Sequence, residues 1–285
     1  MTGAHDRLSA MSIEEIAREA EAADGAAPLD EATWRALRHP ERVAAWERED
    51  GFALLVGEEL SLVVRPSARR RGVGRELLSA VLAEASPEAR GRGPLLAWSH
   101  GNHPGAAALA AAYGFERMRD LWVMRRDASD PLPALEVPSG IEVRGYRPED
   151  ADEVVRVNAA AFAAHPEQGA MDAAELAERM SAEWFDPAGL LVATETGSDR
   201  LLGFHWTKRH SPELGEVYVV GIDPAAQGRG LGKLLTLAGL HHLTDAGVRE
   251  VLLYVESDNA PAIAVYSRLG FRHDEVDTHV QYRRS

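Results

Sequence analysis

Residues 219–235 read VVGIDPAAQGRGLGKLL, an apolar strand followed by a glycine-rich turn and the leucine-rich start of a helix. The backbone N–H groups of such a turn point outward without partners, and the helix dipole adds positive potential at the same place. Together these features hold a phosphate or diphosphate group. The stretch therefore predicts a binding site for a ligand that carries a diphosphate.

Two nucleotide-binding patterns do not fit this turn. A Walker loop needs Gly at the position of Gln227 and Ser or Thr at the position of Leu234, and a dinucleotide fingerprint that starts at Gly228 or Gly230 lacks its third Gly. The remaining pattern, Gln227-x-x-Gly230-x-Gly232 after a strand that ends in Asp-Pro, resembles the acyl-CoA signature of the GNAT superfamily of N-acetyltransferases. The resemblance implies acetyl-CoA as the acetyl donor.

The same arrangement occurs a second time, because residues 62–78 read LVVRPSARRRGVGRELL. Gly72 and Gly230 are 158 residues apart, and Gly114 and Gly270, each before a Phe, are 156 residues apart. Repetition on this scale indicates tandem domains rather than a solenoid of short repeats. We expect an α/β (α+β) chain of two tandem GNAT domains, each with a mixed central sheet flanked by helices. The Pro-rich stretch 127–140 predicts a linker between domain 1–136 and domain 141–285.

Hydrophobic periodicity and capping residues place the other elements. In the second domain we expect strands at 141–144, 190–194, 201–208, 216–222 and 251–256, and helices at 148–162, 172–184, 231–246 and 260–269. In the first domain we expect helices at 13–22 and 31–37 and strands at 43–48 and 52–56. The first domain is short before its glycine turn, so one early element is expected to be missing or reduced there.

Composition excludes several classes of function. The 285 residues carry a formal net charge of −14, which disfavours nucleic-acid binding, and contain no Cys, which excludes disulfides, thiolate catalysis and Cys-ligated zinc. No stretch has the apolar length of a membrane span, and the N-terminal residues do not resemble a signal peptide. We expect a monomeric cytoplasmic protein that binds neither a metal nor a membrane. Arginines at 69–71 and 75 and the pair Arg229 and Lys233 surround the two glycine turns, where a bound anion would offset their charge.

Transfer of an acyl group from a thioester to an amine needs a base, stabilisation of the oxyanion and an acid for the leaving thiolate. Glu216 is the candidate base; on a strict period of two it shares a face with Tyr218 and Val220. Backbone N–H groups at 220–222 are candidates to polarise the thioester carbonyl. The alternative for Glu216 is a solvated carboxylate at a strand end.

Residues 255–271, VESDNAPAIAVYSRLGF, extend the resemblance to a second GNAT signature. In that family the Asn contacts the cofactor and the Tyr hydroxyl protonates the thiolate, which implies these roles for Asn259 and Tyr266. The alternative for Tyr266 is a core tyrosine with a local partner for its hydroxyl. In the first copy, Asn102 is the expected match of Asn259 and Glu58 that of Glu216, but Ala110 stands in place of the tyrosine. We therefore expect the first domain to bind acetyl-CoA or serve as a scaffold, without catalysing acetyl transfer.

The expected contacts to the cofactor lie in both copies. They are Val220, Gly221, Ile222, Gln227, Gly228, Arg229, Gly230, Leu231, Gly232, Lys233, Asn259, Ala260, Ala262, Ile263 and Ala264 in the second domain, and Leu62, Val63, Val64, Arg70, Arg71, Gly72, Val73, Gly74 and Arg75 in the first.

Longer runs in the second domain narrow the family. The runs FHWTK at 204–208, GEVYVVG at 215–221, LYVESDN at 253–259 and AAFAAHPEQG at 160–169 resemble the mycothiol synthase family. The resemblance implies acetylation of the cysteinyl amine of a glucosaminyl-inositol conjugate, the last step of mycothiol biosynthesis. It places substrate contacts at Glu31, Glu167, Lys208, Glu216 and Tyr254. Two alternatives stay open, namely a tandem GNAT enzyme for another small-molecule or peptide amine, and a non-catalytic acyl-CoA sensor. The histidines at 165, 205, 241 and 242 lack a metal-binding spacing.

Overall fold

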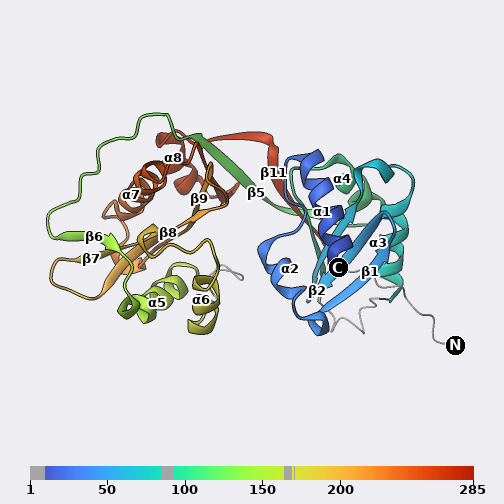
Figure 1. Ribbon diagram of the computed structural model, residues 1–285, viewed down its shortest axis with the longest axis horizontal. Coiled ribbons are helices and arrows are strands. Elements are labelled where there is room, and N and C mark those ends of the chain that lie inside the picture. The colour runs from blue at the N-terminus through green and yellow to red at the C-terminus, as the bar shows by residue number, and fades with distance from the viewer. Residues whose placement is uncertain (1–9, 85–92, 164–168, 170) are drawn as a thin grey trace. The chain divides into compact units, whose positions relative to one another are not determined.

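The structure is a computed structural model that describes residues 10–84, 93–163, 169 and 171–285 (Figure 1). The chain forms two compact units. Unit 1 comprises residues 1–122 and 274–285, and unit 2 comprises residues 123–273. This division differs from the predicted domains 1–136 and 141–285, because residues 123–136 belong to unit 2 and the last strand of the chain packs with unit 1. Among the described residues, no helix has both the length and the apolarity that are needed to cross a bilayer.

Unit 1 is a sheet with helices on both faces. Its elements are α1 (Ala10–Asp24), α2 (Glu31–Ala36), β1 (Val43–Arg48), β2 (Gly51–Val56), β3 (Glu59–Val64), α3 (Val73–Glu84), β4 (Leu95–Ser99), α4 (Pro104–Ala112), the first part of β5 (Glu116–Asp127) and most of β11 (Arg272–Arg284). The strand order in this unit is β1-β2-β3-β4-β11-β5. Phe52 and Leu54 of β2 pack with α1, whereas Ala53 and Leu55 pack with α3, so the side chains alternate between two cores.

The C-terminal strand completes unit 1. Strand β11 pairs antiparallel with β4, with Val280 opposite Ser99 and Tyr282 opposite Ala97. Val280 is fully buried and Tyr282 is nearly so, in the core that also holds Leu77 of α3. The end of the chain therefore contributes to the fold of the unit in which the chain begins.

Unit 2 has a similar scheme, with an additional edge strand. It contains the end of β5, β6 (Ile141–Gly145), α5 (Ala151–Ala161), α6 (Ala173–Met180), β7 (Leu190–Glu195), β8 (Leu201–Arg209), β9 (Leu214–Ile222), α7 (Leu231–Asp245), β10 (Glu250–Glu256) and α8 (Ala260–Arg268). The strand order is β5-β10-β9-β8-β7-β6, so the additional edge strand is β6 and β5 lies directly beside β10. Within residues 10–84, no strand corresponds to β6, so the early element that unit 1 lacks is this edge strand.

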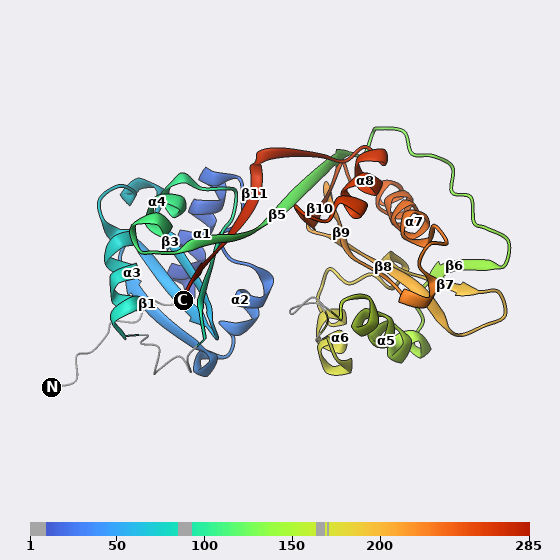
Figure 2. The same cartoon turned by 180° about the vertical axis from the view of Figure 1, so that it is seen from behind.

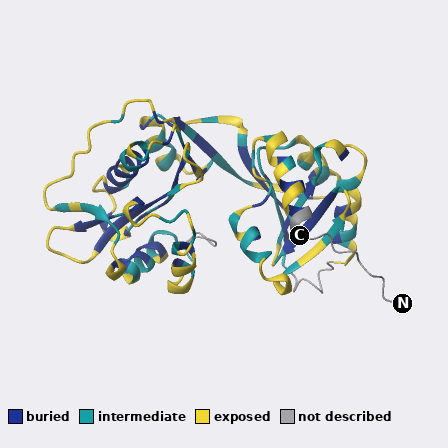
Figure 3. Ribbon diagram, in the orientation of Figure 1, coloured by how far each residue is buried: buried dark blue, intermediate teal, exposed yellow. Residues whose placement is uncertain are grey.

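The helices of unit 2 cover both faces of its sheet, with α5 and α6 on one face and α7 and α8 on the other (Figures 1 and 2). The α5/α6 face is packed by Val154, Val157 and Leu176 against Phe204 and Trp206 of β8. Figure 3 shows that buried residues gather in the central strands and along α7. Helix α6 ends at Met180, four residues before the predicted end.

Helix α7 lies directly over β8. His205 of β8 is fully buried, and its Nδ1 lies 2.8 Å from the carbonyl oxygen of Leu235. Burial lowers the pKa of His205 to about 4, so the ring is neutral at physiological pH and donates to that carbonyl. His205 is therefore part of the core and not a candidate base.

Gly239 makes this packing possible. A Cβ atom on Gly239 would lie 2.1 Å from the His205 ring. Gly-to-Ala changes inside helices usually stabilise a protein by about 1 kcal/mol, but here we expect Gly239→Ala to lower the free energy of unfolding by about 1–3 kcal/mol through overpacking. Urea unfolding measures the change.

The matched control for this prediction is Gly232→Ala in the same helix. The nearest atom to a Cβ at position 232 is Ile222 Cγ1, at 3.9 Å. We expect this variant to gain about 0.5–1 kcal/mol. Equal shifts of the unfolding midpoint in the two variants would contradict the packing argument.

Candidate active site

The glycine turn of unit 2 is built as the sequence predicts. Asp223 Oδ1 accepts a hydrogen bond from the N–H of Ala225 at 2.9 Å, and its Oδ2 accepts one from Arg156 at 2.7 Å. Gly228 and Gly230 have φ angles of 79° and 76°, which favour glycine. Gly230 is the N-cap of α7 and has no side chain with which to cap it. The first N–H groups of α7 are thus open to an anion.

Strands β9 and β10 part beside this turn. They pair in parallel from Leu214 opposite Glu250 to Val217 opposite Leu253, and no pairing joins the described residues beyond these. Both strands continue, β9 to Ile222 and β10 to Glu256. The backbone at 220–222 therefore lies at an opening between two strands, where an extended ligand can hydrogen-bond to free main-chain groups.

A β-bulge corrects the predicted face assignment along β9. Trp206 pairs with Val219 and Thr207 with Val217, so Tyr218 is an extra residue in the ladder. Val219 packs in the same α5/α6 core as Tyr218, although a strict period of two places them on opposite faces. Glu216 does share a face with Tyr218, because its direct partner is Lys208, whose Nζ lies over the Tyr218 ring. The bulge therefore changes the predicted face of Val219 and leaves that of Glu216 unchanged.

Glu216 is buried and paired, which contradicts the alternative of a solvated strand end. Its side chain is 6% exposed, and Oε2 lies 2.6 Å from Nε2 of His210. Lys208 lies opposite it, with Nζ 4.7 Å from the ring centroid of Trp184 and 5.1 Å from that of Tyr218. A carboxylate, a cation and two aromatic rings therefore lie together on the α5/α6 face.

Tyr266 lies in α8, and its hydroxyl has no hydrogen-bond partner among the described residues. Asn259 caps the helix by accepting a hydrogen bond from the N–H of Ala262 at 3.2 Å. The Tyr266 ring contacts Phe271 edge-on with centroids 6.0 Å apart. Burial raises the pKa of the phenol above its usual value. Tyr266 is therefore not a core tyrosine with a local partner, and it holds its proton at neutral pH.

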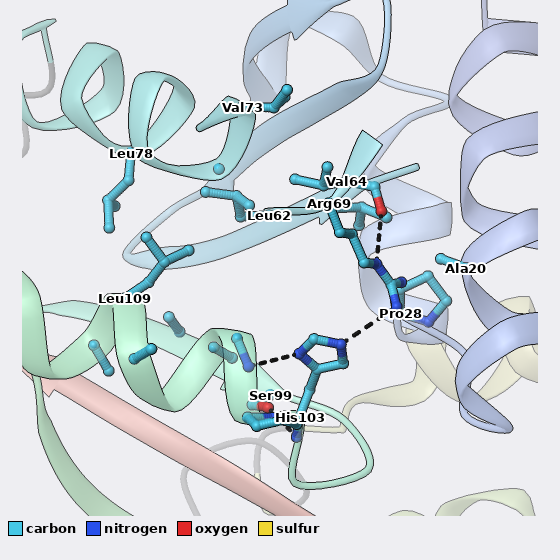
Figure 4. A pocket seen from close by; sticks show the side chains of 18 of the residues that line it. Ala20, Pro28, Leu62, Val64, Arg69, Val73, Leu78, Ser99, His103 and Leu109 are labelled. Atoms are coloured by element: carbon cyan, nitrogen blue, oxygen red, sulfur yellow. Dashed lines mark hydrogen bonds between the residues drawn. The ribbon is translucent and has the colours of Figure 1, made fainter. Parts of the chain in front are cut away.

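Unit 1 repeats the opening and the turn (Figure 4). Strands β3 and β4 pair only at Glu59 opposite Leu96 and Leu60 opposite Ala97. A pocket of about 960 Å³ lies at this parting. Figure 4 shows side chains of β3, α3 and α4 around it, together with Arg69, which donates to the Val64 carbonyl.

The basic turn of unit 1 keeps the backbone conformation of unit 2. Arg70, at the position of Gly228, has φ 62°, and Gly72, at the position of Gly230, has φ 99°. An arginine in this region costs roughly 1 kcal/mol of strain. Arg70, Arg71 and Arg75 form no ion pair with the described residues. Within the described part of the chain, the turn therefore presents three unpaired cations near the start of α3.

The structure corrects two matches in the first copy. The N-cap of α4 is His103, whose Nδ1 accepts from the N–H of Gly105, so His103 and not Asn102 takes the place of Asn259. Glu58 lies exposed in the turn before β3, whereas Glu216 is buried inside β9. The match of Ala110 to Tyr266 holds, because each is the seventh residue of its helix.

The remaining predicted substrate residues are Glu31, Tyr254 and Glu167. Glu167 lies outside the described residues. Glu31 begins α2 of unit 1 and lies 3.7 Å from Arg35. Tyr254 is exposed on β10, directly after the last residue paired with β9. Their contacts to substrate stay predictions. Within the described ranges, no three His, Asp or Glu side chains are placed to hold a metal ion.

Comparison with known proteins gives the family. The model of the acetyltransferase (GNAT) family matches residues 157–271, and a second GNAT domain model matches residues 31–117. A protein from Nocardioides sp. named mycothiol acetyltransferase is 64% identical over 99% of both chains. The chain belongs to the mycothiol acetyltransferase family. A relative of the same name from Actinosynnema mirum is 49% identical over 98% of this chain and 97% of its own.

The fold of this family member also matches solved structures. A tandem GNAT protein from the clavulanic acid biosynthesis pathway superposes with a TM-score of 0.71 at 24% identity, covering 96% of this chain and 95% of its own. The tandem GNAT fold predicted from the two glycine turns is confirmed. Sequence reasoning missed His210 and Trp184, which contact Glu216 and Lys208. His210 lies six residues before the predicted base, at the turn between two predicted strands, whereas nothing in the sequence marks Trp184, which lies in the turn after α6.

Proposed function

We propose that the chain transfers the acetyl group of acetyl-CoA to the cysteinyl amine of 1-D-myo-inositol 2-(L-cysteinylamino)-2-deoxy-glucopyranoside, the last step of mycothiol biosynthesis. Family membership over the full chain supports this reaction. The structural observation that carries it is a buried carboxylate, Glu216, on a strand that parts from its neighbour beside an anion-binding helix start. We further propose that the protein acts as a cytoplasmic monomer and binds neither nucleic acid nor membrane.

The residues of unit 2 fit acetyl-CoA. Nothing lies within 4 Å of a Cβ built at Gly228 or Gly230, so a pyrophosphate can approach the turn closely. Lys233 brings positive charge to the same place, whereas the guanidinium of Arg229 lies 3.1 Å from a carboxylate oxygen of Glu195. The parted strands leave main-chain groups at 220–222 for the pantetheine arm. When bound, the cofactor supplies the acetyl thioester and a thiolate leaving group.

Two side chains move the protons in the proposed mechanism. Glu216 takes a proton from the substrate ammonium and leaves a neutral nucleophilic amine. Backbone N–H groups around Gly221 polarise the carbonyl and stabilise the oxyanion. Tyr266 gives its proton to the departing sulfur, which suits a phenol whose pKa burial keeps high. Lys208 and the carboxylates Glu31 and Glu167 are proposed to hold the hydroxyl-rich substrate together with Tyr254.

The test of the proposed reaction is a competition assay with mass spectrometry. The purified chain is mixed with acetyl-CoA and equal amounts of the desacetyl thiol precursor, an aminoglycoside and a peptide. We expect the acetylated precursor as the dominant product. Preferential acetylation of another amine would support the second enzyme hypothesis, and no product with any amine would revive the acyl-CoA sensor.

We also propose that the 960 Å³ pocket of unit 1 binds acetyl-CoA without turnover. The three arginines beside the start of α3 support a diphosphate ligand, and Ala110 provides no acid. Calorimetric titration with acetyl-CoA should give two sites per chain. Arg71→Ala combined with Arg75→Ala should remove the site in unit 1, because single phosphate contacts contribute about 1–3 kcal/mol each. The rate of acetylation should stay within about twofold, because the proposed catalytic residues lie in unit 2. A stoichiometry of one in the unchanged chain would contradict this part of the proposal.

A further inference from the structure

His210 is the side chain that joins the buried Glu216 carboxylate to solvent. Its Nε2 lies 2.6 Å from Glu216 Oε2, a short hydrogen bond to a carboxylate oxygen. Among the described residues, His210 is the side chain that hydrogen-bonds this carboxylate. The Glu216 side chain is 6% exposed, whereas the His210 side chain is 34% exposed. One ring therefore contacts a buried acceptor and water at the same time.

The turn that carries His210 is fixed by hydrogen bonds. The His210 N–H donates to the Leu214 carbonyl at 2.9 Å, and Ser211 Oγ accepts from the N–H groups of Glu213 and Leu214. The Glu213 carbonyl accepts from the N–H of Arg249 at 2.7 Å. The hairpin between β8 and β9 is thus tied to the start of β10, and the imidazole is held toward Glu216 before substrate arrives.

Two other charged groups near this turn have other partners. The Glu213 side chain pairs with Arg249. Lys208, opposite Glu216 in the ladder, has its Nζ over the rings of Trp184 and Tyr218. The imidazole is therefore the titratable group that contacts the Glu216 carboxylate directly.

Acetylation of an ammonium group by a thioester releases one proton to solvent for each turnover. The amine nitrogen loses two protons in all, of which one ends on the thiol of the product. The second is first taken by Glu216, which lies inside the protein and must be deprotonated again before the next cycle. A buried base of this kind needs an exit for its proton.

We propose that His210 positions the Glu216 carboxylate and relays its proton to water. The inference rests on the proposed role of Glu216 as the base. An ammonium N–H bond breaks as the O–H bond of Glu216 forms. The neutral ring donates from Nε2 to the resting carboxylate, and once Glu216 is protonated the ring shifts its own proton to Nδ1 through water. The O–H bond of Glu216 then breaks as an N–H bond forms at His210 Nε2, and the imidazolium loses its Nδ1 proton to water. The carboxylate and the neutral ring are restored, so charge and protons balance.

The test compares His210→Gln, His210→Ala and the wild type in steady-state acetylation. Gln keeps a hydrogen-bond donor but carries no proton to solvent, and Ala removes both functions. We expect both variants to lose about 10- to 100-fold in kcat, below the full range for a lost base, with the KM for acetyl-CoA within about twofold. Added imidazole should restore part of the rate of His210→Ala in proportion to its concentration, because the vacated position is one-third exposed.

A matched control exists in the same unit. His242 Nε2, in α7, lies 3.1 Å from Asp186 Oδ2, a second His–carboxylate pair that does not include Glu216. His242→Ala should keep kcat within about twofold and should not respond to imidazole. Circular dichroism and acetyl-CoA affinity verify that each variant is folded.

The outcomes separate this inference from the proposed function. If Glu216→Gln is inactive while His210→Gln keeps the wild-type rate, the relay is wrong and the base assignment stands. Loss of rate in His210→Ala without any rescue by imidazole, in a folded protein that binds acetyl-CoA, also overturns the relay. If Glu216→Gln retains full activity, the base assignment itself fails.

Discussion

Glu216→Gln is expected to slow acetylation by about 10²- to 10⁴-fold, the range for loss of a general base. The substitution keeps the size of a side chain that is 6% exposed and keeps an oxygen that can bond His210. It removes the negative charge and with it the ability to take the ammonium proton. The affinity for acetyl-CoA, measured by calorimetry, should change little, because the expected cofactor contacts are main-chain groups and the α7 start.

The same substitution at Glu213 is the control. Glu213 lies three residues earlier, in the β8–β9 hairpin, and its side chain is 61% exposed and paired with Arg249. Exposed ion pairs contribute little to stability, so the kcat of Glu213→Gln should lie within about twofold of the wild-type value. A kcat of Glu216→Gln equal to that of Glu213→Gln would remove Glu216 from the mechanism.

The features predicted from sequence are those that local rules determine. The turn at Gly228 and Gly230 requires left-handed backbone, and Asn259 is a capping residue followed by a helical pattern. Both occur where predicted. The second copy was found in the same way, because its own glycine turn precedes a leucine-rich helix.

The features that sequence did not predict depend on pairing between strands. Tyr218 is bulged because β8 and β9 shift register between Trp206 and Thr207, which no alternation of residue types signals. Likewise, nothing in the order of residues shows that Val280 and Tyr282 pack in unit 1. His210 contacts Glu216 because a hairpin folds back between them, so the pair is set by the turn and not by a motif.

Tyr266→Phe is expected to lower kcat by about 10²- to 10⁴-fold by removing the acid for the leaving thiolate. The ring and its contact with Phe271 remain, so folding and acetyl-CoA affinity should be kept. Steady-state rates with the desacetyl precursor measure the loss. The substitution breaks no hydrogen bond within the described residues, so its effect on the rate reports the loss of the hydroxyl alone.

The pH dependence gives this prediction a second readout. Burial raises the pKa of Tyr266 above its usual value of 10, so the phenol stays protonated, and an acid, at every pH below that. The ratio of wild-type to variant rates should therefore be constant between about pH 7 and pH 9. Tyr146→Phe is the matched control, since Tyr146 is in the same unit and burial also raises its pKa, but it packs in the α5/α6 core. A wild-type advantage that disappears below pH 9, or an equal loss in Tyr146→Phe, would show that the Tyr266 hydroxyl does not protonate the sulfur.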